Sequence, residues 1–162
     1  MNSADVIVVG AGPTGLALAC ELALAGVRCR LLERRAEESN LTRAFAVHAR
    51  TLELLDARGL ADEVLLQGHL VDRVAPVPGA VLKLDILDTR YPYLEIVPQS
   101  GTERVLRARA ERLGVEIVRG ARVVGLRPAR AASRSSSMRA HSDCRPCSIS
   151  RSYGGGVSHV TR

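Results

Sequence analysis

The sequence is poor in aromatic residues: tryptophan is absent, phenylalanine occurs once and tyrosine three times in 162 residues. Side chains that could stack on unpaired bases are therefore scarce, which argues against a single-stranded nucleic acid as partner. The hydrophobic fraction is still 46%, so leucine, valine, isoleucine and alanine must fill the core. A chain of this length has room for about one domain.

Lysine is also nearly absent, because Lys83 is the only one and arginine supplies the rest of the 23 basic residues. The net charge of +6 lies mostly in residues 131–162, which hold five arginines and a single acid. The rest of the chain is close to neutral. A basic body of the kind that binds nucleic acid is missing, so we expect no nucleic-acid partner.

The sequence has no basic leader and no long apolar run. Its first ten residues, MNSADVIVVG, carry an acid and no basic residue, unlike a secretory signal. The longest apolar stretch, residues 16–27, contains Glu21 and is too short to span a bilayer. Cys20 and Cys29 lie in core-like segments, which suits a reducing compartment. We expect a cytoplasmic protein without a membrane segment.

Residues 5–33 have the pattern of a strand, a helix and a second strand. Residues 5–9 form an apolar run of the length of a buried parallel strand. Pro13 stands where a helix would begin, residues 16–25 are apolar on nearly every face, and Gly26 ends them. Residues 27–33 then return as a strand. The pattern predicts a βαβ unit.

The alternation continues to about residue 127. A helix is expected over residues 50–58 with Gly59 as its stop, and another from the capping-box pair Ser100 and Glu103 to Gly114. Further strands are expected at residues 81–87, 93–97, 115–118 and 121–126. We therefore predict an α/β, Rossmann-like fold for a domain spanning residues 1–127.

A glycine motif follows the first strand. GAGPTG at residues 10–15 matches G-x-G-x-x-G. In this motif the first glycine permits a tight turn, the second lets the backbone approach a pyrophosphate, and the third allows close packing of helix and strand. Backbone N–H groups at the helix start then face the phosphate charge. The motif predicts a dinucleotide site.

An acid stands at the expected distance from this motif. Glu33, 23 residues beyond Gly10, ends the second strand. Its carboxylate can accept hydrogen bonds from a ribose diol and would repel a 2′-phosphate. FAD and NAD both carry such an ADP half, so these residues alone leave the two cofactors open.

Residues 5–22 and the LLER sequence at residues 31–34 resemble the opening of FAD-dependent aromatic-ring hydroxylases, the single-component flavin monooxygenases similar to para-hydroxybenzoate hydroxylase and polyketide hydroxylases. Residues 42–44 with 50–60 resemble a second block of that family, and residues 97–103 a third. The resemblance covers about residues 4–127. It implies an incomplete FAD/NAD(P)-binding fold with the start of a substrate domain.

The resemblance also implies roles for individual residues. Glu33 would hold the adenosine ribose and Arg34 would lie beside the adenine. Arg43 would reach the phosphates or ribitol, and Gln99 would approach the flavin. The pyrophosphate would be held by five residues of the glycine motif, namely Gly10, Gly12, Pro13, Thr14 and Gly15.

The family's chemistry is the hydroxylation of small aromatic substrates with NAD(P)H as electron donor and O2. It needs a bound flavin and no catalytic triad. The four histidines are scattered, and we assign no catalytic residue, no metal ligand and no oligomeric state. Two alternatives remain open: an NAD-binding module of a dehydrogenase or reductase, and a non-functional fragment.

Residues 128–162 change in character. They hold nine serines after position 130, a GGG run and no apolar periodicity. The family's next block, an Asp-Gly pair, is not found there. We expect a disordered tail or an out-of-frame reading of a GC-rich gene, and a chain that is inactive by itself. Cys144 and Cys147 have C-x-x-C spacing, but no second pair accompanies them.

Overall fold

The structure is a computed structural model that describes residues 4–37, 46–125, 150–153 and 156–157, the last two ranges by their backbone. Arg43 and most of the segment 128–162 lie outside the described residues.

A parallel sheet carries the glycine motif. Strands β1 (Val6–Val9), β2 (Cys29–Glu33) and β8 (Glu116–Arg119) lie in the order β1-β2-β8, and both pairings are parallel. Helix α1 (Pro13–Leu24) connects β1 to β2. The βαβ unit and the α/β fold class predicted from the sequence are confirmed.

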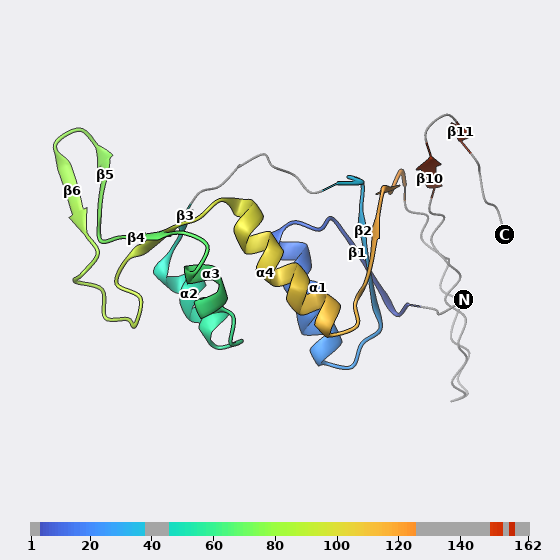
Figure 1. The fold of residues 1–162 in the computed structure, drawn as a ribbon, viewed down its shortest axis with the longest axis horizontal. Coiled ribbons are helices and arrows are strands. Elements are labelled where there is room, and N and C mark those ends of the chain that lie inside the picture. Colours follow the sequence, from blue (N-terminus) through green and yellow to red (C-terminus); the bar gives the residue numbers. More distant parts are fainter. Residues whose placement is uncertain (1–3, 38–45, 126–149, 154–155, 158–162) are drawn as a thin grey trace, which may run out of the picture.

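Helix α4 (Gln99–Arg112) lies beside α1 (Figure 1). Near the middle of both helices, the thiol of Cys20 donates to the carbonyl oxygen of Leu106, with Sγ and O 3.6 Å apart. Leu16 and Leu31 are fully buried between helix and sheet. Each such leucine contributes about 1.5–3 kcal/mol, so this packing fixes where the glycine motif lies.

Helices α1 and α4 run parallel to one another. Each precedes a strand of the same parallel sheet, α1 before β2 and α4 before β8. A helix of this kind runs antiparallel to the strands it connects, so two of them share one direction. The first residues of α1 and α4 therefore lie at the same end of the sheet.

A smaller region follows residue 45. Helices α2 (Ala49–Asp56) and α3 (Ala61–Leu65) lie near an antiparallel sheet of β3 (Ala46–Val47), β7 (Leu94–Ile96) and β4 (His69–Val71), in the order β3-β7-β4. Leu52 and Leu55 are buried and Gly59 has φ +66°, as predicted for the end of this helix. Helix α3 and strand β4 were not predicted.

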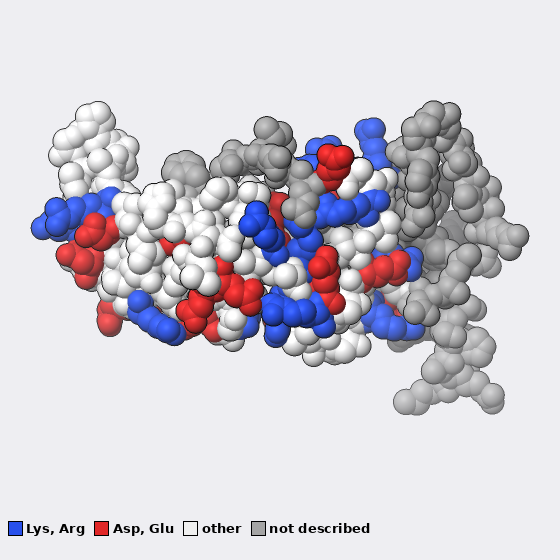
Figure 2. Space-filling model, viewed as in Figure 1, with Lys and Arg blue, Asp and Glu red and all other residues white. Residues whose placement is uncertain are grey.

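A hairpin of β5 (Arg73–Val77) and β6 (Ala80–Lys83) projects from this region (Figure 1). Its tip carries neither blue nor red side chains in the view of Figure 2. Val77 and Val81 are 57% and 62% exposed there. The predicted strand at residues 81–87 corresponds to β6, which ends earlier, at Lys83.

The last described strands are short. Strand β9 (Ala121–Arg122) covers only the first part of the predicted strand 121–126. It pairs antiparallel with β10 (Ser150–Tyr153), which pairs with β11 (Gly156–Val157). The domain boundary at residue 127 and the character of the tail stay predictions.

The capping box expected at Ser100 and Glu103 is wrong. Helix α4 begins at Gln99 with Pro98 as its N-cap, and no side chain caps it. Pro98 has φ −57° and ψ 142°, so the chain enters the helix directly from an extended proline. Ser100 consequently lies inside the first turn, where its hydroxyl cannot act as the cap.

Candidate dinucleotide-binding site

The glycine motif forms a tight turn between β1 and α1. Gly10 has φ +102°, a conformation that side chains with a Cβ rarely adopt. Its N–H donates to the carbonyl oxygen of Leu32 in the next strand, with an N–O distance of 2.8 Å. The turn is thus tied to the end of β2 just before Glu33.

The other two glycines serve different geometric needs. A Cβ on Gly15 would overlap the carbonyl oxygen of Gly10, so this position requires close approach of helix and turn. A Cβ on Gly12 would meet no described atom within 4 Å. The space in front of Gly12 is therefore open, which is what a pyrophosphate lying against the backbone needs.

The start of α1 suits an anion. Gly12 is the N-cap and provides no side-chain hydrogen bond, and Pro13 occupies the first turn. The first turn contains no acidic residue. A helix of 12 residues with uncapped N–H groups at its start presents a partial positive charge there. The residues present fit a dinucleotide pyrophosphate.

Glu33 lies against this turn with both carboxylate oxygens engaged. Oε2 accepts the N–H of Ala11 at 2.7 Å, and Oε1 accepts the N–H of Arg35 at 3.0 Å. The residue is only 9% exposed. The sequence predicted its position beside the glycine motif but not its bond to Ala11, because a backbone partner 22 residues away leaves no sequence signal.

The pKa of Glu33 lies below its ordinary value. Burial raises the pKa, but it is outweighed by the backbone hydrogen bonds from Ala11 and Arg35 and by the positive charges of Arg35 and Arg119. Arg119 faces Glu33 across the register of β2 and β8. The carboxylate is therefore ionised at neutral pH and can accept hydrogen bonds from a diol.

Of the two arginines that the resemblance assigns to the cofactor, only one lies in the described part of the structure. Arg34 follows Glu33 and is exposed at the end of β2, whereas Arg43 lies outside the described residues. Arg50 at the start of α2 instead forms an ion pair with Glu53, with Nη1 and Oε2 2.9 Å apart. Whether Arg34 and Arg43 contact a cofactor stays a prediction.

Gln99 is the first residue of α4 and lies at the same end of the sheet as the glycine turn, because α1 and α4 are parallel. Its Nε2 donates to Oε1 of Glu103 at 2.6 Å. Glu103 is buried, with 8% of its surface exposed. The bond uses the amide nitrogen and leaves the amide oxygen of Gln99 as the group that can accept from a ligand.

Glu95 is a buried acid that the sequence did not single out. It lies in β7 with none of its surface exposed, and both carboxylate oxygens lack a hydrogen-bond partner among the described residues. Burial raises its pKa, and the charge of His69 opposes this shift only in part. Tyr91 is buried in the core and Tyr93 is partly buried against it, with their ring centroids 6.1 Å apart.

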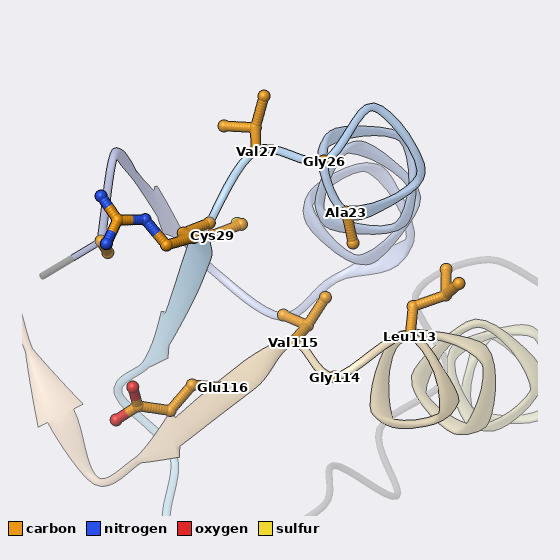
Figure 3. A pocket seen from close by; sticks show the side chains of 10 residues that line it. Ala23, Gly26, Val27, Cys29, Leu113, Gly114, Val115 and Glu116 are labelled. Carbon is orange, nitrogen blue, oxygen red and sulfur yellow. The ribbon is translucent and has the colours of Figure 1, made fainter. Parts of the chain in front are cut away.

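A hollow of about 320 Å³ lies at the other end of α1 (Figure 3). Ala23 and Gly26 border it at the end of α1, Cys29 at the start of β2, and Gly114 and Val115 between α4 and β8. Burial raises the pKa of the Cys29 thiol, which disfavours the reactive thiolate. None of the residues assigned to the cofactor lines this hollow, so it is distinct from the glycine turn.

Within residues 4–37 and 46–125, no three His, Cys, Asp or Glu side chains are grouped so that they could hold a metal ion. No helix within the same ranges is long and apolar enough to cross a membrane.

The turn, the helix start and the buried acid define an α/β dinucleotide-binding domain. The family model described as FAD binding domain matches residues 3–143. The chain therefore belongs to this family, FAD is the cofactor that the family binds, and the resemblance stated from the sequence is confirmed. The alternative of an NAD-binding module receives no support.

Relatives of known activity are similar to this chain over about three quarters of its length. The 12-dehydrotetracycline 5-monooxygenase/anhydrotetracycline 6-monooxygenase of Streptomyces rimosus is 48% identical over 127 residues, which are 75% of this chain and 24% of that protein. The chain thus spans about a quarter of that relative's length.

Solved structures of hydroxylases are also similar to this chain. An anhydrotetracycline hydroxylase from Streptomyces rimosus matches with a TM-score of 0.74 and 46% identity, over 78% of this chain and 26% of that one. An aromatic hydroxylase from angucycline biosynthesis matches with a TM-score of 0.69 and 35% identity, over 78% and 26% of the two chains. The fold is thus that of the first part of FAD-dependent hydroxylases.

Proposed function

We propose that this chain supplies the ADP-binding part of a flavin-dependent monooxygenase that hydroxylates small aromatic substrates with NAD(P)H and O2. The observation that carries the proposal is the ionised, buried Glu33 beside a glycine turn whose second glycine faces open space. Hydroxylases of the same family, one of them an aromatic hydroxylase, support the reaction class.

In this proposal the N–H groups that follow Gly12 at the start of α1 bind the pyrophosphate, with Pro13, Thr14 and the other two motif glycines shaping the turn. Glu33 binds the adenosine ribose, and Arg34 lies beside the adenine. ADP should bind more tightly than 2′-phospho-ADP, because a phosphate would meet the Glu33 carboxylate. Loss of a hydrogen-bond partner that carries a charge costs about 1.5–3 kcal/mol, so Glu33→Ala should weaken ADP roughly ten- to hundredfold.

Two residues are assigned to the flavin side. Gln99, at the same end of the sheet as the turn, accepts a hydrogen bond from the ribitol or flavin through its free amide oxygen, and Arg43 pairs with the phosphates or ribitol. When bound, the flavin supplies the redox chemistry, and the protein orients it and keeps water away. We place the protein in the cytoplasm, which suits its free cysteines Cys20 and Cys29.

The test is the absorption spectrum of the 162-residue chain after incubation with FAD and removal of free ligand. Protein-bound oxidised flavin absorbs in the visible range and NAD does not. A yellow protein fraction with about one FAD per chain would support the proposal. A colourless fraction, together with retention of NAD after a parallel incubation with NAD, would replace it with the dehydrogenase alternative.

A further inference from the structure

We infer that Glu33 is also a positioning residue for the phosphate-binding turn, which it holds in its binding conformation through the N–H of Ala11. The inference deepens the proposed function and rests on it for its ligand, but the bond between Glu33 and Ala11 exists in the protein alone. The same carboxylate would then both hold the pyrophosphate-binding turn in place and bind the ribose diol.

The geometry of the turn supports this double role. Two consecutive N–H groups of the turn are bound to the end of β2: that of Gly10 to the carbonyl of Leu32 at 2.8 Å, and that of Ala11 to Glu33 Oε2 at 2.7 Å. The first bond joins two backbone groups and depends on no side chain. The second depends on the side chain of Glu33, which is thus the one replaceable contact of the pair.

The carboxylate itself is held in place. Its other oxygen accepts the N–H of Arg35, and the residue is 9% exposed, so it cannot swing into solvent. Each carboxylate oxygen can accept two hydrogen bonds, which leaves one acceptor position on each for the two ribose hydroxyls. Holding Ala11 and binding the diol are therefore compatible at the same time.

If Glu33 only bound the ribose, loss of its carboxylate would leave the turn unchanged. If it also holds Ala11, the turn itself should be affected. Ala11 is 8% exposed, so its N–H would be left without a partner in a place with little water. The turn would then rearrange to satisfy this group. Because the next residue, Gly12, begins the pyrophosphate site, binding of any ligand with a diphosphate would suffer, with or without a ribose diol.

The experiment compares ADP with 2′,3′-dideoxy-ADP by calorimetry on the 162-residue chain, using wild type, Glu33→Ala and Glu116→Ala. Glu116 is an exposed acid on β8 that pairs with Arg30, so its loss matches the charge change away from the turn. We expect Glu33→Ala to weaken dideoxy-ADP roughly tenfold and ADP further, and Glu116→Ala to leave both within about twofold. Equal binding of dideoxy-ADP by wild type and Glu33→Ala would overturn the inference.

A second measurement needs no ligand and no variant. In the wild-type chain, the amide proton of Ala11 should exchange slowly with solvent, and its NMR shift should follow the protonation of Glu33 as the pH falls below the ordinary range of a glutamate. The charges facing Glu33 are those of Arg35 and Arg119. Fast exchange with no such titration would refute the positioning role. If the Ala11 amide exchanges slowly and titrates with Glu33, but calorimetry shows no ADP binding, the proposed function is refuted and the positioning role stands.

Discussion

The amide nitrogen of Gln99 lies 2.6 Å from the carboxylate oxygen Oε1 of Glu103, one turn along the same helix. This bond fixes the side chain that the proposed function places nearest to the flavin. Because Glu103 is buried, the pair is shielded from competing water. The orientation of Gln99 therefore depends on Glu103, a neighbour to which the proposal assigns no role in binding the cofactor.

The first prediction concerns this pair. Gln99→Ala should weaken FAD by about 0.5–1.5 kcal/mol and leave ADP unchanged, because Gln99 is assigned to the flavin side. Glu103→Gln should have a smaller effect in the same direction, since its amide can still accept from Gln99. Fluorescence titration with FAD and calorimetry with ADP measure both. An equal loss of FAD and ADP would show that Gln99 supports the fold and not the cofactor.

Glu95 should make stability depend on pH. Its pKa is raised in the folded state, so the folded protein favours the protonated acid. The stability that this group contributes is fully present below the unfolded pKa and is lost as the pH rises through the folded pKa. Glu95→Gln stays neutral and should therefore gain stability relative to wild type as the pH rises.

Thermal unfolding of wild type and Glu95→Gln between about pH 4 and pH 8 tests this, because the difference between the two removes the contribution of other acids. Glu63→Gln, at an exposed position paired with Arg112, is the control for loss of a charge. A stability difference that is constant over this range would show that Glu95 finds a partner in the folded protein.

Two of the three glycines of the turn, Gly15 and Gly12, should respond differently to alanine. Gly15→Ala should lower stability by about 1–3 kcal/mol, because its Cβ would overlap the carbonyl oxygen of Gly10. Gly12→Ala should change stability by less than about 1 kcal/mol, since Gly12 has φ −77° and open space around the Cβ position. Urea unfolding of both variants measures this. Equal destabilisation would mean that the turn is packed differently.

The 162-residue chain alone should yield no hydroxylated product. Most residues assigned in the proposal bind the ADP half of FAD, and the chain spans about a quarter of its relatives' length. A site open to water would at most oxidise NADH and release hydrogen peroxide. Oxygen uptake with NADH and NADPH beside a panel of phenols, followed by mass spectrometry, checks this. Stoichiometric hydroxylated phenol would show that the active site is complete in this chain.

The sequence predicted those features that depend on local spacing. The turn at residues 10–15, the ends of helices at Gly26, Gly59 and Gly114, and the acid at the end of β2 all follow from short patterns and were found. Helix α3, with five residues, is too short for apolar periodicity to appear. Strand β4 is mostly exposed and shows no alternation.

Contacts between distant segments could not be predicted. The bond from Ala11 to Glu33 joins a backbone group to a side chain, and the burial of Glu95 arises only when β3 and β4 pair on both sides of β7. The start of α4 was misplaced because the capping-box pattern fits Ser100 and Glu103 by spacing alone. Pro98 in an extended conformation starts the helix earlier, and Glu103 pairs with Gln99 instead.

The central claim is that the turn around Gly12 binds the pyrophosphate of FAD. Its most direct test is calorimetric titration of ADP into wild type and Gly12→Val, with circular dichroism to show that both are folded. A Cβ at Gly12 meets no described atom within 4 Å, so the variant should fold while its side chain fills the space of the pyrophosphate. We expect wild type to bind ADP and folded Gly12→Val to bind none. Unchanged ADP affinity in the variant would contradict it.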